Sequence, residues 1–334
     1  MNKYGIAVAG NMVVDIPYKV MGLPGPGELT TIQEIFSRTC GGALCNVIVD
    51  LANLDGSLPL TALGRLGEDA EGDYILSLLK KYPNINSANI RRKGITSFTS
   101  VMADEITKQR SFFHYRGANA FFSEDDIDWE KINADFLHIG YILLLDTLDS
   151  VDSEYGTKMA RLLHNAQKRG IKTSIDVVSE KGTRFVTHVP PALKYTDYCI
   201  INEFEAEKTT GILLRDDKNN LVHSGIRGAL EKLKAWGVST WTIIHSPEGG
   251  FGLDAGNNYE EVPGLKLPDG YIKGTVGAGD AFCSGVIYAA YNGLNLRESL
   301  KMGTAAAACS LSEPGSTEGM RSAKDAMALY NSFQ

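Results

Sequence analysis

The sequence has few cysteines and arranges none of them as a framework for metal or disulfides. It holds five cysteines in 334 residues, without a C-x-x-C pair, and six histidines. An odd, scattered set is typical of reduced thiols in a cytoplasmic protein and argues against a zinc site or a disulfide-stapled fold. The five are Cys40, Cys45, Cys199, Cys283 and Cys309.

Long apolar runs and an excess of basic residues are also missing. No stretch approaches the roughly 18 apolar residues of a membrane span. The start, "MNKYGIAVAG", does not have the pattern of a signal peptide. The formal net charge of −7 disfavours nucleic acid and anionic membranes as partners. We therefore expect a cytoplasmic protein that binds neither nucleic acid nor membrane.

Two common phosphate-binding motifs are excluded by the glycine-rich segment "GTVGAGDAF" at 274–282. A P-loop needs lysine where Asp280 stands, and a dinucleotide fingerprint needs glycine where Phe282 stands. What remains is a turn that can bind an anion through backbone N–H groups and ends in a carboxylate. This arrangement suits phosphoryl transfer in which the turn holds the phosphate and Asp280 takes a proton from an attacking hydroxyl. The alternative is a plain strand-to-helix turn with Asp280 as the N-cap.

Strand and helix patterns alternate along most of the chain. This rhythm predicts an α/β fold with a mostly parallel central sheet and helices on both faces. Expected strands lie at 4–10, 58–67, 134–144 and 172–178, and at the starts of 196–211 and 239–254. Expected helices lie at 41–55, 68–82, 152–170, 225–237, 280–293 and 296–312.

Two segments rich in threonine and aromatic residues, about 12–40 and 96–120, do not follow this rhythm. Their alternating pattern predicts a small separate sheet. We expect it to act as a lid over the site, inserted into a single domain that spans 1–334. Apolar residues such as Phe98, Phe112 and Tyr115 on this sheet predict that two copies pair into a homodimer.

Four segments, taken together and in order, resemble the ribokinase-like (PfkB-type) carbohydrate kinases over nearly the whole chain. They are "AGNMVVD" (9–15), "GGALCNVIVDLANLDGSLPLTALGRLGEDAEG" (41–72), "NEFEAEKTTG" (202–211) and "GTVGAGDAFCSG" (274–285). The resemblance implies a ribokinase-like three-layer α/β/α domain with a small β-sheet lid. It also implies the ATP-dependent phosphorylation of a hydroxymethyl group of a small sugar.

The resemblance implies a sugar site at the N-terminal segments. Asp15 ends a predicted strand, and a carboxylate can accept hydrogen bonds from two neighbouring hydroxyls. A glycine pair lets the backbone approach the sugar closely, and an asparagine offers both a donor and an acceptor. The implied sugar-binding residues are Asp15, Gly41, Gly42, Asn46 and Asn119.

The resemblance also implies sites for ATP and Mg²⁺. Asn202 and Glu205 lie three residues apart on one helical face and match the family's pair that orders Mg²⁺ through water. Their alternative is a helix-capping box. The implied nucleotide-binding residues are Asn202, Glu205, Ser246, Gly249, Thr275 and Cys309.

The chain departs from the family pattern at two positions. Ser246 stands at the first glycine of the usual G-x-x-G turn, whose second glycine is Gly249. Gly274, preceded by Lys273, stands where many members have an aspartate that helps to bind a monovalent cation. We therefore expect only weak activation by potassium.

The implied reaction assigns catalysis to one turn. Asp280 is the general base, and the anion hole consists of Gly277, Ala278 and Gly279. None of the six histidines is predicted to take part in the chemistry. A nucleoside kinase on the same fold and a catalytically idle sugar-binding or regulatory protein remain alternatives. The sequence does not identify the acceptor among small sugars, nucleosides and phosphorylated sugars.

Overall fold

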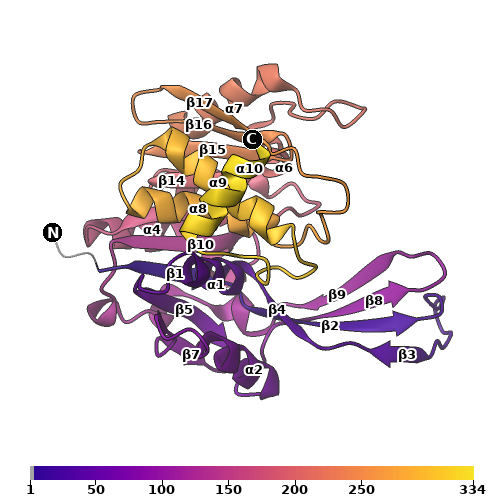
Figure 1. The fold of residues 1–334 in the computed structure, drawn as a ribbon. Coiled ribbons are helices and arrows are strands. Elements are labelled where there is room, and N and C mark those ends of the chain that lie inside the picture. The colour runs from indigo at the N-terminus through magenta and orange to yellow at the C-terminus, as the bar shows by residue number, and fades with distance from the viewer. Residues whose placement is uncertain (1–3) are drawn as a thin grey trace.

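The computed structural model describes residues 4–334 and centres on a ten-stranded sheet (Figure 1). The strand order is β17-β16-β15-β14-β13-β10-β1-β5-β6, with β7 paired to β5. All neighbours from β15 to β6 and β7 are parallel, and β16 and β17 add an antiparallel edge. The strands are β1 (Ile6–Gly10), β5 (Leu60–Leu66), β6 (Ile85–Asn86), β7 (Ile90–Arg92), β10 (Phe136–Ile142), β13 (Lys172–Val177), β14 (Tyr198–Asn202), β15 (Trp241–Ser246), β16 (Gly249–Leu253) and β17 (Tyr259–Pro263).

Helices cover both faces of this sheet. On one face lie α1 (Ala43–Leu54), α2 (Ala70–Leu79), α8 (Ala278–Tyr291), α9 (Leu296–Ser310) and α10 (Ala323–Phe333). On the other lie α4 (Lys158–Lys168), α5 (Phe185–Leu193), α6 (Glu203–Thr210) and α7 (His223–Ala235). Short turns of helix are α3 (Asp146–Asp149) and the 3₁₀ segments Gly117–Phe121, Glu124–Asp126 and Trp129–Lys131.

Each face has its own hydrophobic core, because successive residues of a strand point to opposite sides of the sheet. In β1, Ile6 and Val8 belong to one core, and Ala7 and Ala9 to the other. Helix α1 buries Leu44, Val47, Ile48 and Leu51, the helical spacing expected from the sequence. Since the parallel strands are buried on both sides, some of them, such as β1 (IAVAG), read as continuous apolar runs.

A separate five-stranded sheet projects from the main body (Figure 1). Its order is β3-β2-β8-β9, with β4 paired to β2. The register puts Thr39, Asp15, Thr99 and His114 in one row across four strands, so their side chains share one face. Its strands are β2 (Val13–Val20), β3 (Ile32–Ile35), β4 (Thr39–Gly41), β8 (Phe98–Asp104) and β9 (Arg110–Tyr115).

The predicted fold class is confirmed, and three details of the prediction need correction. The helix expected over 152–170 begins at Lys158. The Asp152 carboxylate accepts the N–H groups of Glu154 and Tyr155, which folds the preceding residues into a hairpin of β11 (Val151–Asp152) and β12 (Gly156–Thr157). Helices α5 and α10 were not predicted. Within residues 4–334, no helix has the length and apolar character needed to cross a bilayer.

Candidate active site

Asp280 lies in the first turn of α8, buried beneath the carboxyl edge of the main sheet. Its Oδ1 accepts a hydrogen bond of 2.6 Å from the Tyr141 hydroxyl, and its Oδ2 accepts one of 2.8 Å from Asn46 Nδ2. Burial raises the pKa of Asp280 to about 6, and the two hydrogen bonds oppose that rise. Gly277 is the N-cap of α8, so the alternative of Asp280 as N-cap is wrong.

The turn before Asp280 has the geometry of an anion site. Gly277 has a φ of 81°, and a Cβ there would lie 2.7 Å from the Cβ of Ser316. No side chain caps the N-terminus of α8. The first N–H groups of a helix have no partner within the helix, and the helix dipole favours negative charge there. The turn of Gly277, Ala278 and Gly279 can therefore hold a phosphate.

Asn46, predicted to bind sugar, is hydrogen-bonded at both ends of its amide to residues next to this turn. Its Nδ2 donates to Asp280, and its Oδ1 accepts a 2.9 Å hydrogen bond from the Ser316 hydroxyl. The residue thus orients the Asp280 carboxylate and ties α1 to α8 and to the loop that follows α9. A direct contact between Asn46 and sugar stays a prediction.

The other predicted sugar residues gather at the junction of the small sheet and α1. Asp15 faces Gly41, where an added Cβ would lie 3.3 Å from Asp15 Oδ2. Burial raises the pKa of Asp15, and a hydrogen bond with Thr99 opposes this rise. Gly42 has a φ of 93° and precedes α1. Its position next to the Asn11 carbonyl leaves no room for a Cβ.

Asn119 lies next to this junction, and both ends of its amide are hydrogen-bonded to the backbone. Its Oδ1 accepts from Met12 N–H at 3.1 Å, and its Nδ2 donates to the Met12 carbonyl at 2.9 Å. The side chain is 2% exposed. Asn119 therefore fixes the start of β2, and a sugar contact stays a prediction.

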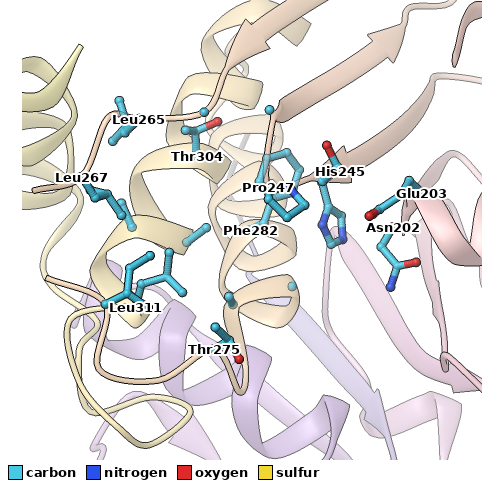
Figure 2. Close-up of a pocket in the computed structure, with 18 of the residues that line it drawn as sticks. Asn202, Glu203, His245, Pro247, Leu265, Leu267, Thr275, Phe282, Thr304 and Leu311 are labelled. Atoms are coloured by element: carbon cyan, nitrogen blue, oxygen red, sulfur yellow. The ribbon is translucent and has the colours of Figure 1, made fainter. Parts of the chain in front are cut away.

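The nucleotide candidates surround a cavity of about 710 Å³. Figure 2 shows Leu265, Leu267 and Leu311 at one end of it, and His245 and Asn202 at the other. Among the predicted residues, the lining includes Asn202, Ser246, Gly249 and Thr275.

The prediction for Cys309 needs correction. Its side chain is 0% exposed and belongs to the hydrophobic core between α9 and the sheet. Its neighbours Thr304, Ala307 and Ala308 form that wall of the cavity instead. Because of the helical spacing, Thr304, Ala307 and Ala308 face the cavity, whereas Cys309 faces the core.

A second cavity, of about 240 Å³, adjoins Asp280. Tyr141, Asp176, Asn202 and Glu205 line it together with Asp280. Burial, reinforced by the charges of Glu205 and Asp280, raises the pKa of Asp176. Tyr141 and Asp176 were not predicted. Both lie near the carboxyl ends of their strands, β10 and β13. The prediction that Asp15 also ends a strand is wrong, because Asp15 is the third residue of β2, which continues to Val20 in the small sheet.

Asn202 and Glu205 form the capping box that was the alternative prediction for this pair. Asn202 Oδ1 accepts from Glu205 N–H at 2.8 Å, and Glu205 Oε2 accepts from Asn202 N–H at 2.9 Å. Burial raises the pKa of Glu205. The described residues contain no cluster of three His, Cys, Asp or Glu side chains suited to a metal ion. A magnesium ion that keeps most of its water ligands needs no such cluster.

Two arginines meet at the carboxyl end of β10. Arg116 Nη1 and Arg184 Nη2 both donate to the Leu143 carbonyl, at 3.3 and 2.7 Å. Arg116 also pairs with Asp146, and Arg184 with Glu180. Leu143 follows Tyr141, which donates to Asp280, by two residues. Neither arginine is among the described residues that line the two cavities.

Comparison with known proteins defines the class. Over 98% of this chain and 99% of each other chain, the fold matches ribokinase from Thermotoga maritima (TM-score 0.78, 23% identity) and Arabidopsis thaliana ribokinase solved with ribose and ATP (0.79, 22%). A nucleoside kinase from Methanocaldococcus jannaschii also matches, with a TM-score of 0.75 at 18% identity over 99% of this chain and 100% of that one. The fold is therefore ribokinase-like.

The family follows from the sequence. The family model described as "pfkB family carbohydrate kinase" matches residues 3–323. The 5-dehydro-2-deoxygluconokinase of Listeria innocua is 22% identical over 98% of this chain and 96% of its own length, and that of Bacillus subtilis is 22% identical over 96% and 94%. The chain belongs to the PfkB family of carbohydrate kinases and is an ATP-dependent carbohydrate kinase.

Proposed function

We propose that this kinase transfers the γ-phosphoryl group of ATP to a hydroxymethyl group of a small sugar, with Asp280 as general base. The observation that carries the proposal is the position of Asp280. Its carboxylate lies in the first turn of α8 and lines the smaller cavity, which adjoins the nucleotide-sized one at Gly279. It also accepts a hydrogen bond from Asn46 of α1, the helix that begins next to the junction with Asp15. Each carboxylate oxygen accepts one hydrogen bond from the protein and keeps a lone pair for a substrate hydroxyl.

In this reaction the sugar oxygen attacks the γ-phosphorus. The bond from phosphorus to the bridging oxygen of ADP breaks, and the hydroxyl proton passes to Asp280. The N–H groups of the turn stabilise the charge on the transferred group. Tyr141 and Asn46 hold the carboxylate in line, so positioning supplies much of the catalysis.

The second cavity suits Mg²⁺. Asp176, Glu205 and Asp280 line it, and no lysine or arginine is among its described lining residues. Burial raises the pKa of Asp176 and of Glu205, and the charge of Asp280 adds to both rises, so a bound cation would relieve this repulsion. Asn202, Glu205 and Asp176 would hold the ion, largely through water. The ion would supply charge neutralisation for the phosphates.

The small sheet would act as the lid and as the contact between two copies. Exposed apolar side chains on it include Ile35 (67%), Phe112 (65%) and Phe113 (59%). Closure over the sugar would exclude water, which otherwise competes as acceptor. Light scattering should give twice the chain mass at micromolar concentration, and Phe113→Glu should give monomer. A parent chain that stays monomeric at these concentrations would contradict the dimer. A cytoplasmic location stays a prediction.

For the acceptor we favour a sugar acid of the kind named for the relatives, 5-dehydro-2-deoxygluconate. The support is the pair Arg116 and Arg184, which Asp146 and Glu180 fix in place. Within the described residues, their hydrogen bonds leave Arg116 Nη2 and Arg184 Nη1 free to donate. Arginine binds a carboxylate well because its donors are planar and paired.

A panel of neutral sugars, sugar acids and nucleosides, assayed for ADP release, tests the proposal. We expect a sugar acid to give the highest kcat/KM. Arg116→Gln should raise the KM for that acid about tenfold or more, the effect of losing roughly one hydrogen bond between charged groups. It should leave the KM for ATP unchanged.

Arg161→Gln is the matched control, because Arg161, on α4, pairs with Asp152 of β11 and lines neither cavity. A nucleoside or neutral sugar as the best acceptor would overturn the sugar-acid assignment. Failure of every acceptor, with nucleotide binding intact, would favour an idle binding protein.

A further inference from the structure

The two cavities of the site meet at three residues. Asn202, His245 and Gly279 line both of them. If the proposed function holds, adenine lies in the larger cavity and the γ-phosphate beside Asp280 in the smaller one. The phosphate chain must then pass between these three residues.

The His245 ring lines this passage, and its neighbours fix its orientation. The ring stacks on Phe282, with centroids 4.9 Å apart and planes at 29°. A Cβ on Gly279 would lie 3.2 Å from His245 Cε1, so a side chain at this position would crowd the ring against the first turn of α8. Figure 2 shows the ring directed from β15 towards Asn202. None of the described residues makes a hydrogen bond to either ring nitrogen.

The groups around the passage leave a phosphate chain few donors besides this ring. The smaller cavity is lined by the carboxyl groups of Asp176, Glu205 and Asp280. Its described lining includes no lysine and no arginine. Burial lowers the pKa of His245 to about 4, so its ring is neutral there and has one N–H to donate. A phosphate chain would meet backbone N–H groups of α8 on one side only. A ring N–H from β15 would supply a donor on the other side.

We propose that His245 is a phosphate-binding residue of this kinase. One ring nitrogen donates a hydrogen bond to a nucleotide phosphate oxygen at the passage, and Phe282 keeps the ring plane in place. The ligand class is a nucleoside di- or triphosphate, because its phosphate chain has to pass from the larger cavity to the smaller one. This assignment rests on the proposed function.

The test is calorimetric binding of ATP, ADP and AMP to the full chain. His245→Phe keeps a ring against Phe282 and removes both nitrogens, whereas His245→Gln keeps a donor. We expect His245→Phe to weaken ATP and ADP binding about tenfold or more, as for one lost hydrogen bond to a charged group. AMP binding should change by less than about twofold, and His245→Gln should recover most of the loss.

His223→Phe is the control, since His223 is exposed at the start of α7 and lines neither cavity. Unchanged ATP and ADP affinity in His245→Phe would overturn the inference and leave the proposed function intact. Equal weakening of AMP would also overturn it, because the ring would then act by packing. If His245→Phe does not fold, His245→Asn replaces it and should bind ADP more weakly than His245→Gln. A parent chain that binds no adenine nucleotide would refute both proposals.

Discussion

The nucleotide side and the sugar side of this site are built differently. The nucleotide side is a cavity of about 710 Å³ between β15, β16, α8 and α9, with apolar walls such as Leu265, Leu267 and Phe282. The sugar side is a polar row on a small sheet, where Asp15, Thr99 and His114 share a face. Several apolar side chains on that sheet, among them Ile35, Phe112 and Phe113, are exposed, whereas those of the main sheet are mostly buried.

The difference indicates which part of the site exists before its ligand. Packing in the main core fixes the nucleotide cavity, so its ligand enters a formed space. The small sheet lacks a covering layer, so the sugar or a second copy must complete it. We therefore expect substitutions on the two sides to act on different substrates. Asp280, Asn46 and Asp50 lie where the sides meet.

The largest effect should come from Asp280→Asn, at the boundary between the two sides. We expect kcat to fall by roughly a thousandfold or more, because the proton acceptor is lost. ATP and sugar affinities should change little, since the amide keeps the size of the carboxylate. Single-turnover kinetics with direct binding of both ligands would measure this. A kcat within tenfold of the parent would remove Asp280 as base.

Asp15→Ala should affect sugar binding and leave ATP binding unchanged. Loss of a hydrogen-bonding carboxylate from the sugar junction should raise the sugar KM by about 10- to 100-fold, corresponding to about 1.5–3 kcal/mol. The ATP dissociation constant should stay within experimental error. Thr31→Ala, on an exposed part of the same region, serves as the control. Equal losses for sugar and ATP would show that the two sides are not independent.

Much of the fold on both sides was predictable from the sequence. Alternating apolar periods located the main sheet, most helices and the β8–β9 hairpin, because burial on a sheet or helix face leaves a regular pattern. Helix α5 was missed because Pro190 and Pro191 lie inside it, and prolines normally disfavour a helix interior. The hairpin before α4 depends on one carboxylate, Asp152, and has no apolar period.

The site was predictable only where a local motif marks it. The glycine turn and Asp280 are contiguous, so the sequence indicated them. The hydrogen bond from Asn46 to Asp280 joins residues 234 positions apart. Tyr141 and Asp176 come from two further strands. Such contacts arise from the order of the strands in the sheet, which a single sequence does not specify.

A smaller effect should appear in the pH dependence of the base. The proposed reaction needs Asp280 ionised, so kcat/KM should rise as the pH rises through about 6, the pKa given by burial. The Tyr141 hydrogen bond stabilises the carboxylate, so Tyr141→Phe should raise this pKa and move the acid limb of the profile upward by about one unit. Tyr155→Phe, on the β11–β12 hairpin, is the control. An unshifted acid limb in Tyr141→Phe would mean that another group controls it.

The smallest effect concerns stability, at the seam where α1 packs on α8. Asp50 is 0% exposed, and neither carboxylate oxygen has a hydrogen-bond partner among the described residues. Burial, with the charges of Asp280 and Glu318, raises the pKa of Asp50 well above its usual value. An acid that binds its proton more tightly in the folded state lowers stability as pH rises above its unfolded pKa of about 3.9. In urea unfolding at pH 7.5, Asp50→Ala should therefore have a free energy of unfolding about 1–2 kcal/mol higher than the parent. This difference should shrink towards pH 5.

Asp149→Ala is the matched comparison for Asp50→Ala. Asp149 is 3% exposed, but its two oxygens accept the N–H groups of Leu143 and Leu145, both at 3.1 Å. Its removal leaves two backbone donors unpaired, so this variant should lose about 1–3 kcal/mol. Opposite signs for two buried aspartates would show that hydrogen bonding, rather than burial alone, decides whether a carboxyl group stabilises this fold. A loss of stability in Asp50→Ala as large as that in Asp149→Ala would show that Asp50 has a partner at the seam, and that the two sides of the site are joined there by more than apolar packing.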